Sequence, residues 1–184
     1  PHCGRRVLPD TVSSAVDRVL ALPEGTRFMV AFPLPPSGQT SHRALVESLR
    51  ALGFVRLIAD GVAVDLGNAS SDAPESVGLD LENVELLIVV VDRLKVGPDI
   101  RERLQDSIGT AFREGEGEAL VVLHEGGEPT GDGLEEAAKA GSGEAVRTGL
   151  GGATLSFTER FRCPDHPPEE FPDPTPQLFS FNSP

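Results

Sequence analysis

The sequence predicts an α+β fold, with a mixed, largely antiparallel sheet and about three helices rooted on a small zinc module. The expected elements run helix, strand, helix, three strands, helix and two strands, without a parallel strand–helix–strand series or an internal repeat. Asp60-Gly61 between two apolar runs predicts an antiparallel hairpin. Pairs of zinc-type ligands near both ends of the chain predict the module.

Three stretches show the apolar spacing of amphipathic helices. Asp10 or Thr11 is expected to cap the first helix, and Gly53 to end the second. The second helix is expected to turn its leucines inward (Leu45, Leu49 and Leu52). The helices are expected at residues 11–22, about 41–52 and 98–114.

Short apolar and β-branched runs predict the strands. Pro33 is expected to stop the first strand. Residues 86–91 are apolar on both faces, so this strand is placed at the centre of the sheet, ending in Asp92-Arg93. The strands are expected at residues 27–32, 54–59, 62–66, 86–91, 119–123 and 153–161.

Composition excludes several classes of function. The formal net charge is −13 with only two lysines, so the cationic surface that grips nucleic-acid phosphates is not expected. No apolar run reaches the ~20 residues of a membrane helix. Residues 67–79 are expected to form a loop, and the Gly-rich residues 125–152 a disordered one.

Catalytic motifs are not found. The chain has no phosphate-binding loop of the Gly-x-x-x-x-Gly-Lys type, and its Gly-x-Gly runs lie in the low-complexity segment. His42 and His124 stand alone and are expected to be solvated or capping residues. We therefore expect no active site in this chain, no ATP hydrolysis and no duplex DNA binding.

Cys3, Cys163 and His166 are the candidate zinc ligands, because structural zinc sites combine two closely spaced pairs of thiolate or imidazole groups. A further cysteine just before Pro1 is expected to complete the set, as if the chain were a piece of a larger protein. Three alternatives stay open. They are two cysteines without metal, a Cys3–Cys163 disulfide, and a site that pairs Cys163 and His166 with ligands beyond Pro184.

On this basis the chain divides into three parts: a first zinc half-site at residues 1–10, an α+β domain at 11–160, and a second half-site with the lead into further sequence at 161–184.

Several separate blocks of the sequence resemble one family, in the order in which that family has them. They are Thr11-Val12-Ser13, Val16 to Gly25, Gly53-Phe54-Val55-Arg56, Asp60-Gly61, Val89 to Leu94, Ile100 to Leu104, Asp106-Ser107, Leu155-Ser156-Phe157, Cys163-Pro164 and Leu178 to Pro184. The family is UvrA, the damage-sensing ATPase subunit of the bacterial excision nuclease.

The resemblance implies that the α+β part is the UvrB-binding domain of a UvrA-like protein, inserted in its first ATP-binding half. It also implies that residues 161–184 lead into the signature region of that ABC-type ATPase. It implies that Arg56 and Arg93, with Asp92 of the same block, face UvrB. The chain departs from the family in four places. Three of them remove positive charge: residues 70–75 lack lysine, Ile58 stands where a second arginine is usual, and Pro35 to Gly38 replace a basic loop. The fourth is the second ligand pair, which ends in His166-Pro167 without the usual Cys-Gly.

The leading hypothesis is therefore a protein-docking module that recruits UvrB in nucleotide excision repair. The resemblance further implies structural zinc, ATP bound only elsewhere in the parent protein, a homodimeric parent acting on damaged DNA, and a cytoplasmic location without a membrane. The alternative is a structural, zinc-rooted insertion of a divergent UvrA-like ABC ATPase that has lost or changed its docking role. A free-standing enzyme is the third hypothesis.

Overall fold

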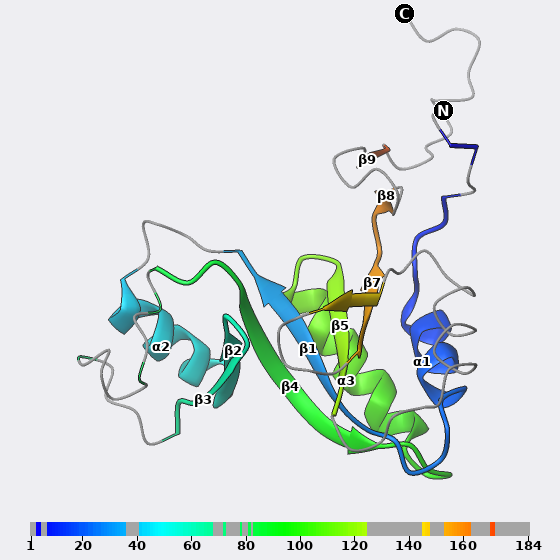
Figure 1. The fold of residues 1–184 in the computed structure, drawn as a ribbon, viewed down its shortest axis with the longest axis horizontal. Coiled ribbons are helices and arrows are strands. Elements are labelled where there is room, and N and C mark those ends of the chain that lie inside the picture. The colour runs from blue at the N-terminus through cyan, green and yellow to red at the C-terminus, as the bar shows by residue number, and fades with distance from the viewer. Residues whose placement is uncertain are drawn as a thin grey trace, which may run out of the picture.

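The structure, a computed structural model, describes residues 3–4, 7–35, 41–67, 72, 78, 81, 83–124, 145–147, 153–162 and 170–171. Within them, seven antiparallel strands form one sheet in the order β3-β2-β4-β1-β5-β7-β6 (Figure 1). The strands are β1 (Arg27–Leu34), β2 (Arg56–Ala59), β3 (Val62–Asp65), β4 (Leu87–Lys95), β5 (Glu118–Leu123), β6 (Ala145–Arg147) and β7 (Ala153–Thr158). A separate two-stranded ribbon pairs β8 (Phe161–Arg162) with β9 (Glu170–Phe171).

Three helices pack against this sheet, which confirms the predicted α+β class. α3 (Arg101–Glu114) lies across β1, β4 and β5, and α1 (Val12–Leu20) packs beside α3. α2 (His42–Ala51) lies at the other end of the sheet, beside β2 and β3 (Figure 1). There the Arg50 side chain donates a 2.8 Å hydrogen bond from Nε to the Leu66 carbonyl, just after β3.

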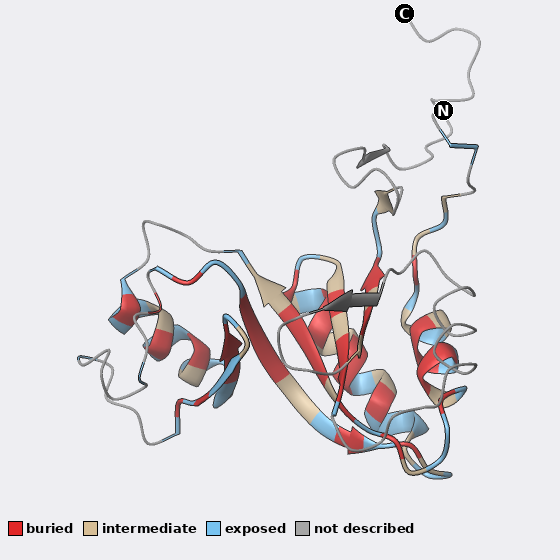
Figure 2. Cartoon of the chain, in the orientation of Figure 1, coloured by how far each residue is buried: buried red, intermediate tan, exposed pale blue. Residues whose placement is uncertain are grey.

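The two faces of the sheet bury different side chains. Buried residues, red in Figure 2, lie along the strands and on all three helices. The main core fills the helix-covered face and includes Phe28, Val30, Phe32 and Phe157. A smaller apolar cluster lies on the other face. Its buried members are Ala31, Ile58, Ile88 and Val90, with Met29 and Leu120 partly buried beside them.

Local signals in the sequence set several element boundaries. The Thr11 hydroxyl accepts a 3.1 Å hydrogen bond from the Ser14 N–H, so Thr11 is the cap of α1. Asp60 and Gly61 join β2 to β3 with φ values of 47° and 83°, as the predicted tight hairpin requires. Gly53 follows α2 with φ 87°, a conformation that favours glycine.

Two strands are longer than predicted. β1 continues through Pro33, because β5 pairs with β1 only from Phe28 to Ala31 and leaves the next residues with one neighbouring strand. Proline is tolerated at such a position, since its missing N–H removes no ladder bond there. β4 does not end at Asp92-Arg93 either, but continues to Lys95.

Two side chains at the ends of α2, His42 in its first turn and Leu52 just after it, differ in burial from the prediction. Leu52, expected inward, is 61% exposed because the helix has ended by that residue. His42, expected to be solvated or capping, is only 3% exposed, and its Nδ1 accepts a 3.4 Å hydrogen bond from the Leu81 N–H. The predicted disorder of residues 125–152 lies outside the described residues apart from β6. No helix of the described ranges is long and apolar enough to cross a membrane.

Candidate docking face and domain root

A β-bulge in β4 shapes the face of the sheet opposite the helices. Val30 of β1 pairs with Asp92, but the next residue, Ala31, pairs with Val90. Val91 is therefore an extra residue with no counterpart on β1. Bulges of this kind re-aim the side chains that follow them.

A pocket of about 470 Å³ opens on this face. Its lining comes from β1 to β5 and from the residue after β5: Met29, Arg56, Leu57, Ile58, Ala63, Val64, Asp65, Val90, Arg93, Val122, Leu123 and His124. Members of the smaller apolar cluster form part of this lining, so the pocket combines apolar and charged side chains.

Arg56 and Arg93, the two arginines singled out in the sequence, both line this pocket. Both residues are exposed. Arg56 begins β2 and lies 3.9 Å from the Asp65 carboxylate on β3, measured from Nε to Oδ2. The structure therefore places both arginines at one hollow between neighbouring strands.

Other cations belong to the same face. Arg27 pairs with Lys95 in the β1–β4 register, and Met29 pairs with Arg93. Side chains two residues apart on a strand share a face, so Arg27 and Lys95 lie on the pocket side with Met29 and Arg93. Within the described part of the chain, neither Arg27, Arg93 nor Lys95 forms an ion pair. We define Arg27, Arg56, Arg93 and Lys95 as the cationic face.

Asp92, also singled out in the sequence, points to the opposite side of the sheet. Its carboxylate accepts hydrogen bonds from Arg103 of α3, at 2.7 Å from Nε and 2.8 Å from an η nitrogen. The Arg93 backbone N–H donates another at 2.8 Å. The Ser107 hydroxyl of α3 shares its single proton between the Asp92 carboxylate at 3.2 Å and the Arg103 carbonyl at 2.8 Å. Partial burial acts to raise the pKa of Asp92, but these donors and the charge of Arg103 outweigh it and hold the pKa below its ordinary value.

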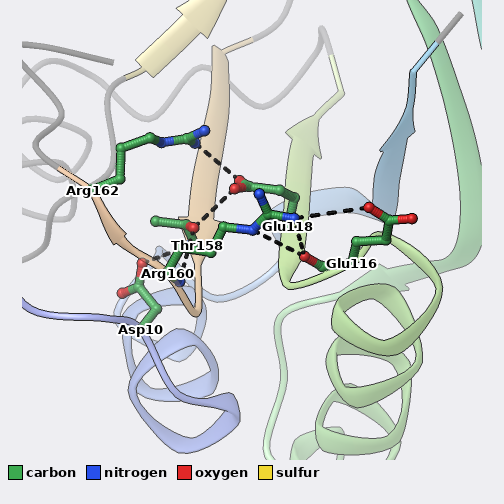
Figure 3. A network of polar contacts seen from close by, with 6 residues as sticks. All are labelled: Asp10, Glu116, Glu118, Thr158, Arg160 and Arg162. Carbon is green, nitrogen blue, oxygen red and sulfur yellow. Dashed lines mark hydrogen bonds and ion pairs between the residues drawn. The ribbon is translucent and has the colours of Figure 1, made fainter. Parts of the chain in front are cut away.

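The chain enters and leaves the domain at one place, which we call the root (Figure 3). The Asp10 N–H donates to the Thr158 carbonyl at 2.7 Å, and the Thr158 N–H donates to the Asp10 carboxylate at 3.0 Å. The Thr158 hydroxyl donates to Glu118 at 2.9 Å, and Arg162 donates to the other carboxylate oxygen of Glu118 at 3.1 Å. Arg160 donates to the Glu116 carbonyl at 3.0 Å.

Arg18 of α1 is buried against the root, where it contacts Asp10 and Phe157. It pairs with Asp10 at 3.2 Å and lies over the Phe157 ring, 4.5 Å from its centroid. Both members of the pair are buried, at 8% and 7% exposure. Burial lowers the pKa of Arg18, although the charge and hydrogen bond of Asp10 act in the opposite direction.

The candidate zinc ligands are only partly within the described residues. Cys3 is exposed, whereas Cys163 and His166 lie outside them. Among the described residues no cluster of three His, Cys, Asp or Glu could hold a metal ion. The zinc site therefore stays a prediction.

The sequence did not single out Arg27 and Lys95. Their two-residue spacing from Met29 and Arg93 could have indicated them, once β4 was extended past Asp92. Arg103 and Ser107 carry the helical spacing of one face of α3, but only the structure places that face against Asp92.

The chain is similar to known proteins of one family. Residues 10–125 match the family described as the UvrA interaction domain. The whole chain aligns with proteins named UvrABC system protein A, at 31% identity in Synechocystis sp., 34% in Pseudomonas aeruginosa and 34% in Mycobacterium tuberculosis. It spans 19%, 17% and 16% of these relatives, less than a fifth of their length. The chain belongs to the UvrA interaction domain family.

Proposed function

We propose that this chain is the docking module through which a UvrA protein recruits UvrB in nucleotide excision repair. The observation that carries the proposal is the joint position of Arg56 and Arg93 at one pocket on an otherwise acidic chain. Arginine suits this role, because its planar and permanently charged guanidinium pairs with carboxylates in a fixed geometry.

The chemistry of the pocket defines the partner surface that fits it. Met29, Ile58 and Val90 offer apolar contact, and the cationic face adds charged side chains from three strands, β1, β2 and β4. A complementary surface presents an apolar side chain flanked by aspartates or glutamates. Such an arrangement has the apolar centre and charged rim common to protein interfaces.

The surrounding assembly belongs to the same proposal. The complete protein is an ATP-hydrolysing, homodimeric subunit that acts on damaged DNA, and this domain contributes partner docking rather than catalysis. The competing function is a structural insertion that no longer docks UvrB. The positive charge lost at Ile58 and at Pro35 to Gly38 favours the structural insertion. The positive charges of Arg27 and Lys95 on the cationic face favour docking instead.

The experiment is a titration of UvrB with the parent chain and with Arg56→Glu, Arg93→Glu and Arg113→Glu. Arg113 is an exposed arginine of α3 and provides the control. Each pocket variant is expected to weaken binding by about 2–5 kcal/mol if its pair is desolvated, and by under ~1 kcal/mol if it lies on the rim.

Two results decide against the docking function. If both pocket variants bind as tightly as Arg113→Glu, the pocket is not the docking surface. If the parent chain itself does not bind UvrB, the structural insertion is the correct function. Circular dichroism of every variant checks that the fold is retained.

We also propose that Cys3, Cys163 and His166 share a structural zinc ion with a cysteine preceding Pro1. The proposal is supported by the pairing of Asp10 with Thr158 at the root, which holds two arms of the chain together. Asp10 lies seven residues after Cys3, and Thr158 lies five residues before Cys163. Zinc would contribute stability by joining the arms. A chain extended upstream to include that cysteine should hold one zinc ion, and Cys3→Ser should weaken its retention; equal zinc content in both chains would contradict the shared site.

A further inference from the structure

We propose that Arg103 and Ser107 are positioning residues that aim Arg93 at the docking pocket by holding Asp92 from the other face of the sheet. This inference rests on the proposed docking function. It assigns to α3, which does not line the pocket, an effect on partner binding.

The first step concerns the direction of side chains along β4. Val90 and Arg93 are three residues apart, so a regular strand would point them to opposite faces. Both nevertheless line the same pocket. The extra residue at Val91 makes this arrangement possible, because it shifts the alternation by one position.

The second step concerns what holds the bulge. Directly after Val91, the Asp92 carboxylate accepts hydrogen bonds from Arg103, Ser107 and the Arg93 backbone N–H. The bond to the Arg93 N–H fixes the backbone that carries the docking side chain. The bonds to Arg103 and Ser107 fix Asp92 itself to α3, a rigid helix packed on β1, β4 and β5.

The third step separates this role from docking. Asp92 pairs with Val30, a residue of the main core, whereas Arg93 pairs with Met29 of the pocket. Arg103 therefore contacts the bulge from the side away from the pocket. If α3 releases Asp92, the bulge loses the carboxylate that favours its conformation, and Arg93 loses its fixed direction.

The test is a double-mutant cycle in UvrB binding. Arg103→Met keeps the aliphatic length of the side chain and removes its donors. It is expected to weaken binding roughly three- to tenfold in the parent chain and to have no effect in an Arg93→Ala background. The matched control is Arg101→Met, which removes an exposed arginine two residues away that pairs with Asp17 instead.

An equal loss in both backgrounds, or no loss in the parent chain, would overturn the proposal. A second measurement needs no partner and separates this proposal from the docking function. Amide hydrogen exchange at Arg93 should be faster in Arg103→Met than in Arg101→Met, because the Arg93 N–H depends on the position of the Asp92 carboxylate. Unchanged exchange refutes the positioning role, while absence of UvrB binding by the parent chain refutes only the docking function.

Discussion

Replacing Asp10 with alanine should destabilise the domain far more than replacing any exposed acid. The Asp10 carboxylate has two roles at the root: it pairs with Arg18 at 3.2 Å and accepts the Thr158 N–H at 3.0 Å. Arg18 is only 8% exposed and lies over Phe157, so it has little access to water when its partner is lost.

The expected magnitude follows from this burial. Removing one member of a buried ion pair takes away the charge that offsets the burial of the other, and costs about 3–5 kcal/mol. The matched control is Asp17→Ala on α1, the helix that carries Arg18. Asp17 pairs with Arg101 at 2.8 Å, but the two side chains are 60% and 51% exposed, and such surface pairs contribute under ~1 kcal/mol.

The assay is urea unfolding monitored by circular dichroism. The free energies of unfolding of parent and variant are compared with one common slope of free energy against urea concentration. The double variant Asp10→Ala with Arg18→Met should recover part of the loss, since no unpaired charge is then buried. If Asp10→Ala costs no more than Asp17→Ala, the root does not depend on this pair and the reasoning is wrong.

Two further perturbations test other parts of the structure. Gly115→Ala should destabilise the fold by about 1–3 kcal/mol, because the new Cβ would lie 2.7 Å from the Ala111 carbonyl and from Phe32 Cβ. Gly109→Ala in α3 should instead stabilise the fold by roughly 0.5–1 kcal/mol, because a Cβ there meets no atom within 4 Å. If urea unfolding gives a change of the same sign for both variants, the packing argument is refuted. Asp92 has a pKa below the ordinary value near 3.9, so its ionised form stabilises the fold above that pH and this contribution is lost as the pH falls through the lowered pKa. The parent chain should therefore exceed Asp92→Asn in stability at pH 6 and lose that advantage below about pH 4; an advantage that persists in acid would contradict it.

The sequence was informative wherever structure depends on neighbours along the chain. The apolar spacing of α1, the Thr11 cap, Gly53 after α2 and the Asp60-Gly61 turn all follow from local backbone and capping preferences. The continuous apolar run of β4 predicted a strand at the centre of the sheet, because a strand covered on both faces needs no polar alternation. β4 lies third of the seven strands, next to the central β1.

What the sequence did not reveal depends on contacts between distant segments. The continuation of β1 through Pro33 depends on where β5 stops, and the burial of His42 depends on the backbone at Leu81. The bulge at Val91 has no composition signal of its own, since Val89, Val90 and Val91 are identical in type. Because of that bulge, Arg93 lies on the same face of the sheet as Val90, and Asp92 lies on the opposite face.

These contacts also explain how a docking face can be held in a fixed relation to the root. Asp92 at the back of the pocket is bound to Arg103 of α3, and Arg101 of the same helix pairs with Asp17 of α1 at 2.8 Å. On α1, Arg18 pairs with Asp10, which in turn bonds to Thr158. A partner carboxylate bound by Arg93 therefore acts on a strand that packed helices and ion pairs connect to the two arms of the chain. Under the proposed docking function, substitutions at the root should therefore change how the docking face is presented even where they leave its arginines intact.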